Sequence, residues 1–193
     1  MIGETTMLEM VYARCASTGI PTFLAIPTKA EEENDVLSRY YRVARDNSLD
    51  IIIRVTSDCP LIPPYEILRC LEEFKSQDCD YLTNRPAVID GWDVEVMSYH
   101  ALSKAYYEAK DSYDREHVTP YIKKDRSIKQ GILDDPKLSV DTESDLQEVR
   151  RYYELERKIL IDNGRYGFVC DELHKTHFVA GHNPKDYPNL QPG

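Results

Sequence analysis

Glycine is scarce in this sequence, and two common phosphate-binding motifs that depend on it are missing. The chain has 193 residues, of which only 8 are glycines. Neither the G-x-G-x-x-G fingerprint of dinucleotide-binding folds nor the G-x-x-x-x-G-K-[ST] loop occurs in it. If the protein handles a nucleotide, it must hold the phosphates by another route, such as a divalent cation bound to carboxylates.

Long apolar segments and an excess of positive charge are also missing. No apolar run approaches the roughly 20 residues of a membrane-spanning helix, and no basic-then-apolar signal segment stands at the front. The 34 acidic side chains outnumber the 24 basic ones, so the formal net charge is -10. This charge argues against wholesale binding to nucleic acid or anionic lipid. We therefore expect a cytoplasmic protein with no nucleic-acid or membrane partner.

The cysteines indicate reduced thiols rather than a disulfide framework. Their number, five, is odd, and no C-x-x-C pair occurs. One group, Cys170, His174, His177 and His182, has a spacing that loosely resembles a zinc site. It contains only one cysteine, however, and a structural zinc site needs four well-placed ligands. We favour the alternative interpretation, a surface helix end followed by a tail.

Strand-like and helix-like segments alternate along the chain. Short β-branched or apolar runs predict strands over residues 22–26, 51–56, 79–82, 93–98 and 138–140. Apolar residues at helical spacing predict helices over 7–15, 36–45, 99–110 and 115–124, one opening at Pro63 and Pro64, and a long one from 142 to about 162. This alternation predicts an α/β fold, a three-layer αβα sandwich with a mostly parallel sheet. We expect one domain over 1–180 and a coil or arm over 181–193.

Two acidic residues follow predicted strands. Asp58 comes after the strand at 51–56, and Asp141 comes after the strand at 138–140. In open α/β sheets, ligands bind at the carboxyl ends of the strands, where two carboxylates can share a Mg²⁺ ion. The alternative is that each is a turn or cap residue, since aspartate is common in both places.

A third candidate is the alternating segment 93–98. Asp93 and Glu95 share one face of the predicted strand, and Val94 and Val96 share the other. If the acidic face points into a cleft, the pair could hold sugar hydroxyls. If it points to solvent, the segment is an ordinary edge strand.

A fourth candidate lies at the start of the helix predicted over 115–124. The planar guanidinium of Arg115 could clamp a phosphate or a carboxylate. His117 could act as an acid–base group, although a single histidine at a helix start is more often structural.

These segments occur together and in order, and here the sequence resembles the cytidylyltransferase superfamily. The resemblance is to the SpsF-like branch of spore-coat polysaccharide biosynthesis, whose relatives make CMP-activated sialic acid, pseudaminic acid and 3-deoxy-manno-octulosonate. It covers roughly residues 2–165. The matching stretches are DVLSRYY at 35–41, RVTSDCPLI at 54–62, DGWDVEV at 90–96, REHVTPYI at 115–122 and SVDTESDL at 139–146.

The resemblance implies a nucleotide-diphospho-sugar transferase fold of Rossmann-like type, in one nucleotidyltransferase-like domain. It implies that the matching carboxylates Asp58 and Asp141 bind Mg²⁺ and are catalytic. The acceptor sugar would meet a set of substrate-binding side chains: Arg39, Asp93, Glu95, Arg115 and His117.

The implied reaction is cytidylyl transfer. A sugar hydroxyl attacks the α-phosphate of CTP and gives a CMP-sugar and pyrophosphate, which demands in-line positioning and neutralisation of phosphate charge. Many relatives are dimers, so a homodimer is an open expectation.

One part of the family pattern has no match in this sequence. The family normally begins with a strand and a loop like A-R-x-G-S-x-R-L-P-x-K, whereas the segment Met1–Glu9 resembles the stretch after that loop. A second gap lies near 29–34. We therefore expect the nucleotide-binding loop to be absent from the given chain, and two alternatives stay open. One is a noncatalytic sugar- or partner-binding homologue, and the other is a glycosyltransferase that uses a nucleotide sugar.

Overall fold

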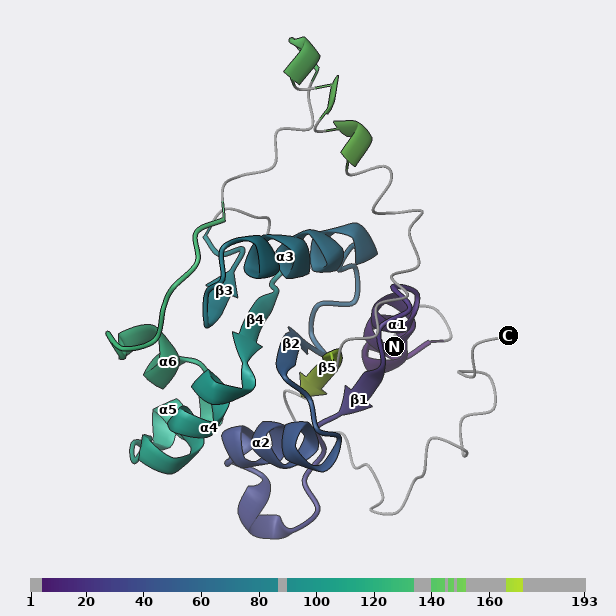
Figure 1. Ribbon diagram of the computed structural model, residues 1–193. Helices are drawn as coiled ribbons and strands as arrows, with labels where there is room; N and C mark the ends of the chain where they lie inside the picture. The colour runs from purple at the N-terminus through teal and green to yellow at the C-terminus, as the bar shows by residue number, and fades with distance from the viewer. Residues whose placement is uncertain are drawn as a thin grey trace.

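The strands form a five-stranded mixed sheet. The computed structural model describes residues 5–86, 90–133, 140–144, 146, 147, 149–151 and 166–171. Their strands are β1 (Thr22–Leu24), β2 (Ile51–Thr56), β3 (Tyr81–Thr83), β4 (Glu95–Ser98) and β5 (Tyr166–Asp171). They lie in the order β1-β5-β2-β4-β3 (Figure 1).

The prediction of a mostly parallel sheet needs correction. The pairs β1–β5 and β5–β2 are parallel, but β2–β4 and β4–β3 are antiparallel. The cause is local, because β3 and β4 are consecutive strands joined without a crossover helix and must therefore run in opposite directions. The second strand of this hairpin lies next to β2.

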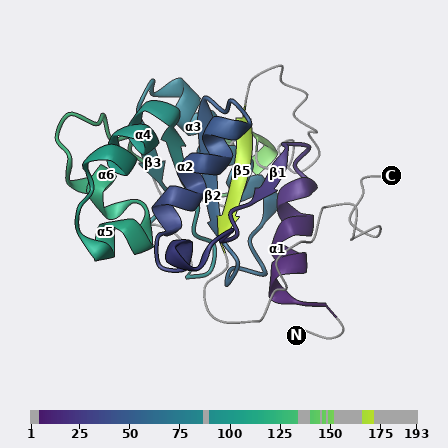
Figure 2. The same ribbon diagram turned by 90° about the horizontal axis from the view of Figure 1, so that it is seen from below.

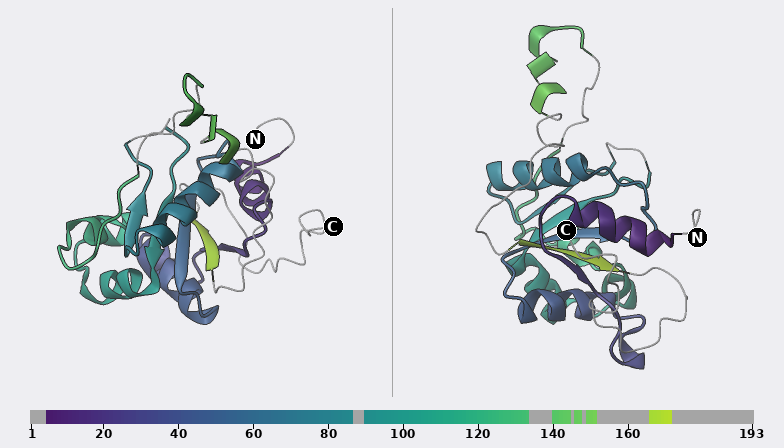
Figure 3. Two further views of the ribbon diagram at one scale, coloured as in Figure 1. Left: turned by 45° about the horizontal axis from the view of Figure 1, so that its top comes forward. Right: turned by 90° about the vertical axis from the view of Figure 1, so that its right-hand side faces the viewer.

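Helices cover both faces of the sheet (Figures 2 and 3). The described helices are α1 (Met7–Ala16), α2 (Val36–Asp46), α3 (Pro64–Ser76), α4 (Tyr99–Glu108), α5 (Ser112–His117) and α6 (Pro120–Lys124), with a 3-10 turn η1 (Ala30–Glu32). The faces are set by the alternation in β2. Ile53 packs in the core with α1 and α3, whereas Ile52 packs in the core with α2 and α4.

Local signals place most of the helix ends where the sequence predicts them. The Asp35 carboxylate accepts from the backbone N–H of Ser38 at 3.2 Å, and the Ser98 hydroxyl accepts from that of Ala101 at 3.1 Å. Both are N-caps that satisfy amides without a partner inside the helix. The first residue of α3 is Pro64, a position at which the missing N–H costs nothing.

The helix predicted over 115–124 is instead two helices. Val118 ends α5 with a φ of 71°, a left-handed conformation that stops the helical path. The next helix, α6, then begins at Pro120. The break changes the direction of the chain just before Lys123, whose ammonium lies 2.7 Å from Glu95 of β4.

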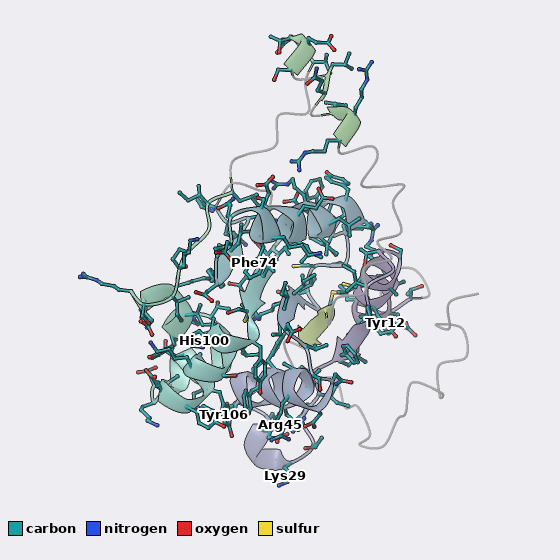
Figure 4. The ribbon with its side chains drawn as sticks, viewed as in Figure 1. Tyr12, Lys29, Arg45, Phe74, His100 and Tyr106 are labelled. Atoms are coloured by element: carbon teal, nitrogen blue, oxygen red, sulfur yellow. The ribbon has the colours of Figure 1, made fainter. Side chains whose placement is uncertain are left out.

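The apolar side chains of α3 confirm the predicted inward face. The residues predicted to point inward are all at most 5% exposed: Ile67, Leu68, Leu71 and Phe74. Phe74 lies on the side of α3 that faces the sheet (Figure 4). Each such side chain contributes roughly 1.5–3 kcal/mol to the free energy of unfolding through burial.

In the sheet, β5 lies between β1 and β2. This strand contains Cys170, so the prediction of a surface helix end at that residue is wrong. The three histidines of the zinc-like spacing lie outside the described residues, as do residues 181–193 and most of the strand predicted over 138–140. Of the long helix predicted from 142, the structure describes residues 142–144, 146, 147 and 149–151; residue 142 is a bend and the others are helical.

Among the described residues, no helix has the length and apolar composition needed to cross a bilayer. Four of the five cysteines, Cys15, Cys59, Cys70 and Cys79, are buried free thiols.

Candidate functional site

A polar row crosses three strands on the face of the sheet that carries α2 and α4. The antiparallel register pairs Arg54 of β2 with Glu95 of β4, and Glu95 with Thr83 of β3. Paired residues on neighbouring strands point to the same face, so the three side chains lie side by side. The valines at 94 and 96 are in the opposite core, which confirms the predicted alternation.

Glu95 is the centre of this row and is only 6% exposed. Its Oε2 accepts from Arg54 Nη1 at 2.7 Å. Its Oε1 accepts from the hydroxyls of Tyr81 at 2.6 Å and Thr119 at 2.8 Å, and lies 2.7 Å from Lys123 Nζ. Both carboxylate oxygens are therefore already occupied, and Glu95 acts as the anchor for two cations.

The charges around Glu95 fix its protonation state. Burial alone would raise its pKa, but the nearby charges of Arg54 and Lys123 more than offset this and lower the pKa to about 2. Burial and the same carboxylate raise the pKa of Tyr81, so its hydroxyl stays a donor. At physiological pH, Glu95 is therefore an anion.

The row opens onto a pocket of about 250 Å³ at the carboxyl ends of β2 and β3. Its lining is Arg54, Thr56, Thr83, Arg85, Asp93, Glu95 and Lys123. Ligand pockets usually measure about 300–1,000 Å³, so this one suits a small polar ligand. Its position agrees with the rule that α/β sheets bind ligands at the carboxyl ends of their strands.

Arg85 and Asp93 form one side of the pocket. Arg85 Nη2 donates to Asp93 Oδ2 at 2.8 Å, and Arg85 also pairs with the exposed carboxylate of Asp90. The Asp93 and Asp90 carboxylates raise the pKa of Arg85. Asp93 and Glu95 thus share the pocket, as the alternation predicts, but each is engaged by a basic side chain.

Asp58 lies one hydrogen bond away from the pocket. Its carboxylate accepts from the hydroxyl of Thr56, which lines the pocket, and its side chain is exposed. The neighbouring thiol of Cys59 lies 3.7 Å from Asp58 Oδ1. Burial raises the pKa of Cys59, which favours the neutral thiol over the thiolate.

The described structure does not bring Asp141 to Asp58. Asp141 is exposed, and the described part of 140–151 lies beyond α3, on the side away from the sheet (Figures 1 and 3). That segment contacts α3 through Arg151, whose Nη1 lies 3.6 Å from Glu72 and 3.4 Å from Glu73. The described residues contain no group of three or more metal-ligating side chains. The described residues do not bring the two carboxylates together, and a shared Mg²⁺ ion stays a prediction of the resemblance.

Arg115 fastens helices together and does not line the pocket. Its Nη2 donates to Asp35 Oδ2 and to Ser38 Oγ, both at 2.7 Å, and its Nη1 donates to the carbonyl oxygens of Tyr106 and Ala109. It also stacks over the Tyr106 ring, 5.6 Å from the centroid, and Figure 4 shows Tyr106 on α4. Arg115 thus joins α5 to α2 and α4.

His117 is also away from the pocket. It is the last residue of α5, and its ring packs edge-on against Tyr113 with centroids 4.3 Å apart. A role of His117 in substrate binding stays a prediction of the resemblance.

Arg39 is a buried cation on α2. The residue is 3% exposed, and within the described part of the chain its Nε has no hydrogen-bond partner. A buried polar atom without a hydrogen-bond partner is costly, so the Nε of Arg39 is a candidate for binding an anion. Arg39 does not line the pocket described above.

Several pocket residues were not predicted from the sequence. Arg54 could have been, because it is the single charged residue in the apolar strand at 51–56. Lys123 could not have been, since the unbroken helix predicted over 115–124 gives no indication that its end reaches Glu95.

The fold and the pocket define a class. A polar pocket at the carboxyl ends of strands, on a sheet with helices on both faces, is the framework of many α/β enzymes. Comparison with known proteins makes this specific. The chain belongs to the cytidylyltransferase family, whose model matches residues 24–167. Within the family, its similarity is to the SpsF-like branch.

Two relatives and one solved structure are similar to this chain. The uncharacterized protein MJ1063 of Methanocaldococcus jannaschii is 31% identical over 178 residues, and the match covers 88% of this chain and 69% of the length of MJ1063. The spore coat polysaccharide biosynthesis protein SpsF of Bacillus subtilis is 26% identical over 158 residues, covering 76% of this chain and 62% of its own.

A cytidylyltransferase from Leptospira borgpetersenii serovar Hardjo-bovis shares the fold, with a TM-score of 0.61 at 21% identity. The match covers 81% of this chain and 84% of the other.

Proposed function

We propose that this protein transfers CMP from CTP to a sugar that serves as a precursor of a surface polysaccharide. Family membership supports the nucleotidyl transfer, and the similarity to SpsF supports the polysaccharide role. The observation that carries the proposal is the Arg54–Glu95–Lys123 cluster. It presents two cations, oriented by a buried carboxylate, to a pocket that suits a small polar ligand.

The pocket suggests how an acceptor sugar would be held. Thr56 and Thr83 offer hydroxyls to sugar oxygens, and Arg54, Arg85 and Lys123 offer cationic donors. The lining has one more basic side chain than acidic ones, so we expect acidic sugars to be better acceptors than amino or neutral sugars. Positioned cations also stabilise the negative charge that develops during nucleotidyl transfer.

Mg²⁺ dependence stays a prediction of the family resemblance. Asp58 is the expected Mg²⁺ ligand that the structure places next to the pocket, because its hydrogen-bond partner Thr56 lines the pocket. A bound divalent cation would supply the positive charge that phosphate chemistry requires. The residues of this chain contribute the binding and orientation of the acceptor.

The test measures pyrophosphate release from CTP with a panel of acidic, amino and neutral sugars. We expect release with an acidic sugar, and we expect EDTA or Asp58→Ala to abolish it. Lys123→Met should lower kcat/KM for the sugar by roughly tenfold to a hundredfold, because it removes a positioned charge-assisted donor. The matched control is Lys129→Met, whose ammonium donates to the carbonyl oxygens of Gln77 and Asp78 outside the pocket.

Two results would contradict the proposal. One is the absence of pyrophosphate release with every sugar, combined with no thermal shift on addition of CTP and Mg²⁺. A thermal shift with a sugar alone would then favour the noncatalytic binding homologue. The other is equal loss of activity in Lys123→Met and Lys129→Met, which would remove the pocket from the argument.

A further inference from the structure

The other face of the sheet holds a buried ion pair. On α3, Arg69 Nη2 donates to Glu66 Oε1 at 2.5 Å and Arg69 Nε donates to Glu66 Oε2 at 2.9 Å. The two side chains are 2% and 0% exposed. Removing two charges from water costs about as much as their attraction returns, so such a pair is weak evidence for stability. Its contacts point to a different role.

The ion pair continues into the hairpin of β3 and β4 through Asn84. Asn84 is fully buried, and its Nδ2 donates to Glu66 Oε1 at 2.9 Å and to the Trp92 carbonyl at 2.7 Å. Its Oδ1 accepts from the backbone N–H of Val94 at 2.9 Å. One amide therefore ties α3 to both arms of the hairpin connection, residues 84–86 and 90–94, which we call the pocket arms.

The pocket arms carry two residues of the pocket. Arg85 directly follows Asn84, and Asp93 lies between Trp92 and Val94, the two residues that Asn84 holds. The Trp92 ring also packs edge-on against Tyr65 of α3, with centroids 6.3 Å apart. The location of Arg85 and Asp93 thus depends on how the arms sit against α3.

We propose that Glu66, Arg69 and Asn84 are positioning residues that set the geometry of the acceptor pocket from the opposite face of the sheet. The guanidinium of Arg69 orients the Glu66 carboxylate, the carboxylate orients the Asn84 amide, and the amide sets the spacing of the pocket arms. The effect on catalysis rests on the proposed function, whereas the seating of the arms does not.

The chemistry of the network requires an amide at position 84. The Nδ2 group gives one hydrogen to Glu66 and the other to the Trp92 carbonyl, while the oxygen accepts from Val94. A carboxylate of the same shape can accept but cannot donate, and it would stand beside the anionic Glu66. Asn84→Asp therefore removes two of the three bonds and adds like-charge repulsion with almost no change in volume.

Trp92 provides a readout that needs no activity, because it is the only tryptophan in the chain. In Asn84→Asp we expect a red-shifted Trp92 emission and stronger quenching by acrylamide. We also expect the KM for the sugar to rise by roughly tenfold, with kcat and the KM for CTP within about twofold, because misplaced binding groups weaken substrate positioning. The matched control is Asn47→Asp, at an exposed helix end where Nδ2 donates only to the Val43 carbonyl at 2.8 Å.

A double variant separates positioning from folding. Glu66→Met with Arg69→Met replaces the ion pair by apolar side chains of similar size, a change that often leaves stability equal or higher. We expect an unchanged or raised Tm together with the same red shift and the same rise in the KM for the sugar. A purely structural ion pair would leave both readouts at their wild-type values.

The outcomes distinguish the two proposals. If folded variants keep the wild-type Trp92 emission, or shift it without raising the KM for the sugar, the positioning proposal is overturned. If the wild-type chain transfers no cytidylyl group, the proposed function fails, and Trp92 emission still decides whether the network seats the pocket arms.

Discussion

Two buried glutamates on opposite faces of one sheet have different surroundings. Glu66, on the α3 face, is fully buried and pairs with Arg69, which is 2% exposed. Glu95, on the other face, pairs with Arg54 and with Lys123, whose side chain is 46% exposed. One network is sealed, and the other reaches a pocket. A buried carboxylate therefore marks a binding site only when its partners extend to a surface that a ligand can reach.

The largest expected effect tests this difference directly. Glu66→Ala should lower the free energy of unfolding by about 3–5 kcal/mol, because it removes the carboxylate that pairs with the buried Arg69 charge. Glu95→Ala should cost less, about 2–3 kcal/mol, because water in the pocket can hydrate Lys123 and part of Arg54. Urea unfolding of the two variants measures both values. A larger loss in Glu95→Ala would contradict the comparison.

The free energy of unfolding should depend on pH through the charge of Glu95. Its pKa in the folded chain, about 2, lies below the ordinary value of 4.5, so the ionised form stabilises the fold at every pH above 4.5. This stabilisation, about 3 kcal/mol in full, is lost as the pH falls from 4.5 towards 2. Between pH 7 and pH 3, the wild-type chain should lose about 2 kcal/mol more than Glu95→Gln. Equal losses in urea unfolding at the two pH values would mean that Arg54 and Lys123 do not hold the carboxylate.

The smallest expected effect lies at the outer rim of the pocket. The side chain of Asp90 is 86% exposed, and its partner Arg85 keeps Asp93 when Asp90 is neutralised. Asp90→Asn should therefore change the free energy of unfolding by less than about 0.5 kcal/mol and the KM for the sugar by less than about twofold. Thermal unfolding and the pyrophosphate assay measure the two quantities. A tenfold change in KM would show that the exposed carboxylate contributes as much as the buried ones.

The sequence predicted what local chemistry decides. The strand Ile51–Thr56 and the caps Asp35 and Ser98 follow from β-branched residues and side-chain oxygens close to the amides they serve. The shared face of Asp93 and Glu95 follows from the two-residue period of a strand. These features need no knowledge of distant parts of the chain.

The rest depends on tertiary contacts that no local pattern carries. That Glu95 pairs with two cations depends on the register of β2 with β4 and on the turn at Val118 that brings Lys123 back to the sheet. The hydrogen bonds of Arg115 require α2, α4 and α5 to meet, and the sequence around Arg115 does not indicate that they do. Whether Asp58 and Asp141 share a metal ion stays a prediction of the resemblance.

The placement of β5 has a consequence for how the chain folds. Ile51 pairs with Tyr166, and Thr22 pairs with Phe168, so the middle of the sheet joins segments more than a hundred residues apart. Bringing such distant segments together carries a loop-closure entropy that local hairpins avoid, and contacts of this range slow folding. The β3–β4 hairpin and its pairing with β2 can form early. The edges of β1 and β2 that pair with β5 remain unpaired until β5 is available. During synthesis these edges stay open to pairing with other chains until residues 166–171 have emerged from the ribosome.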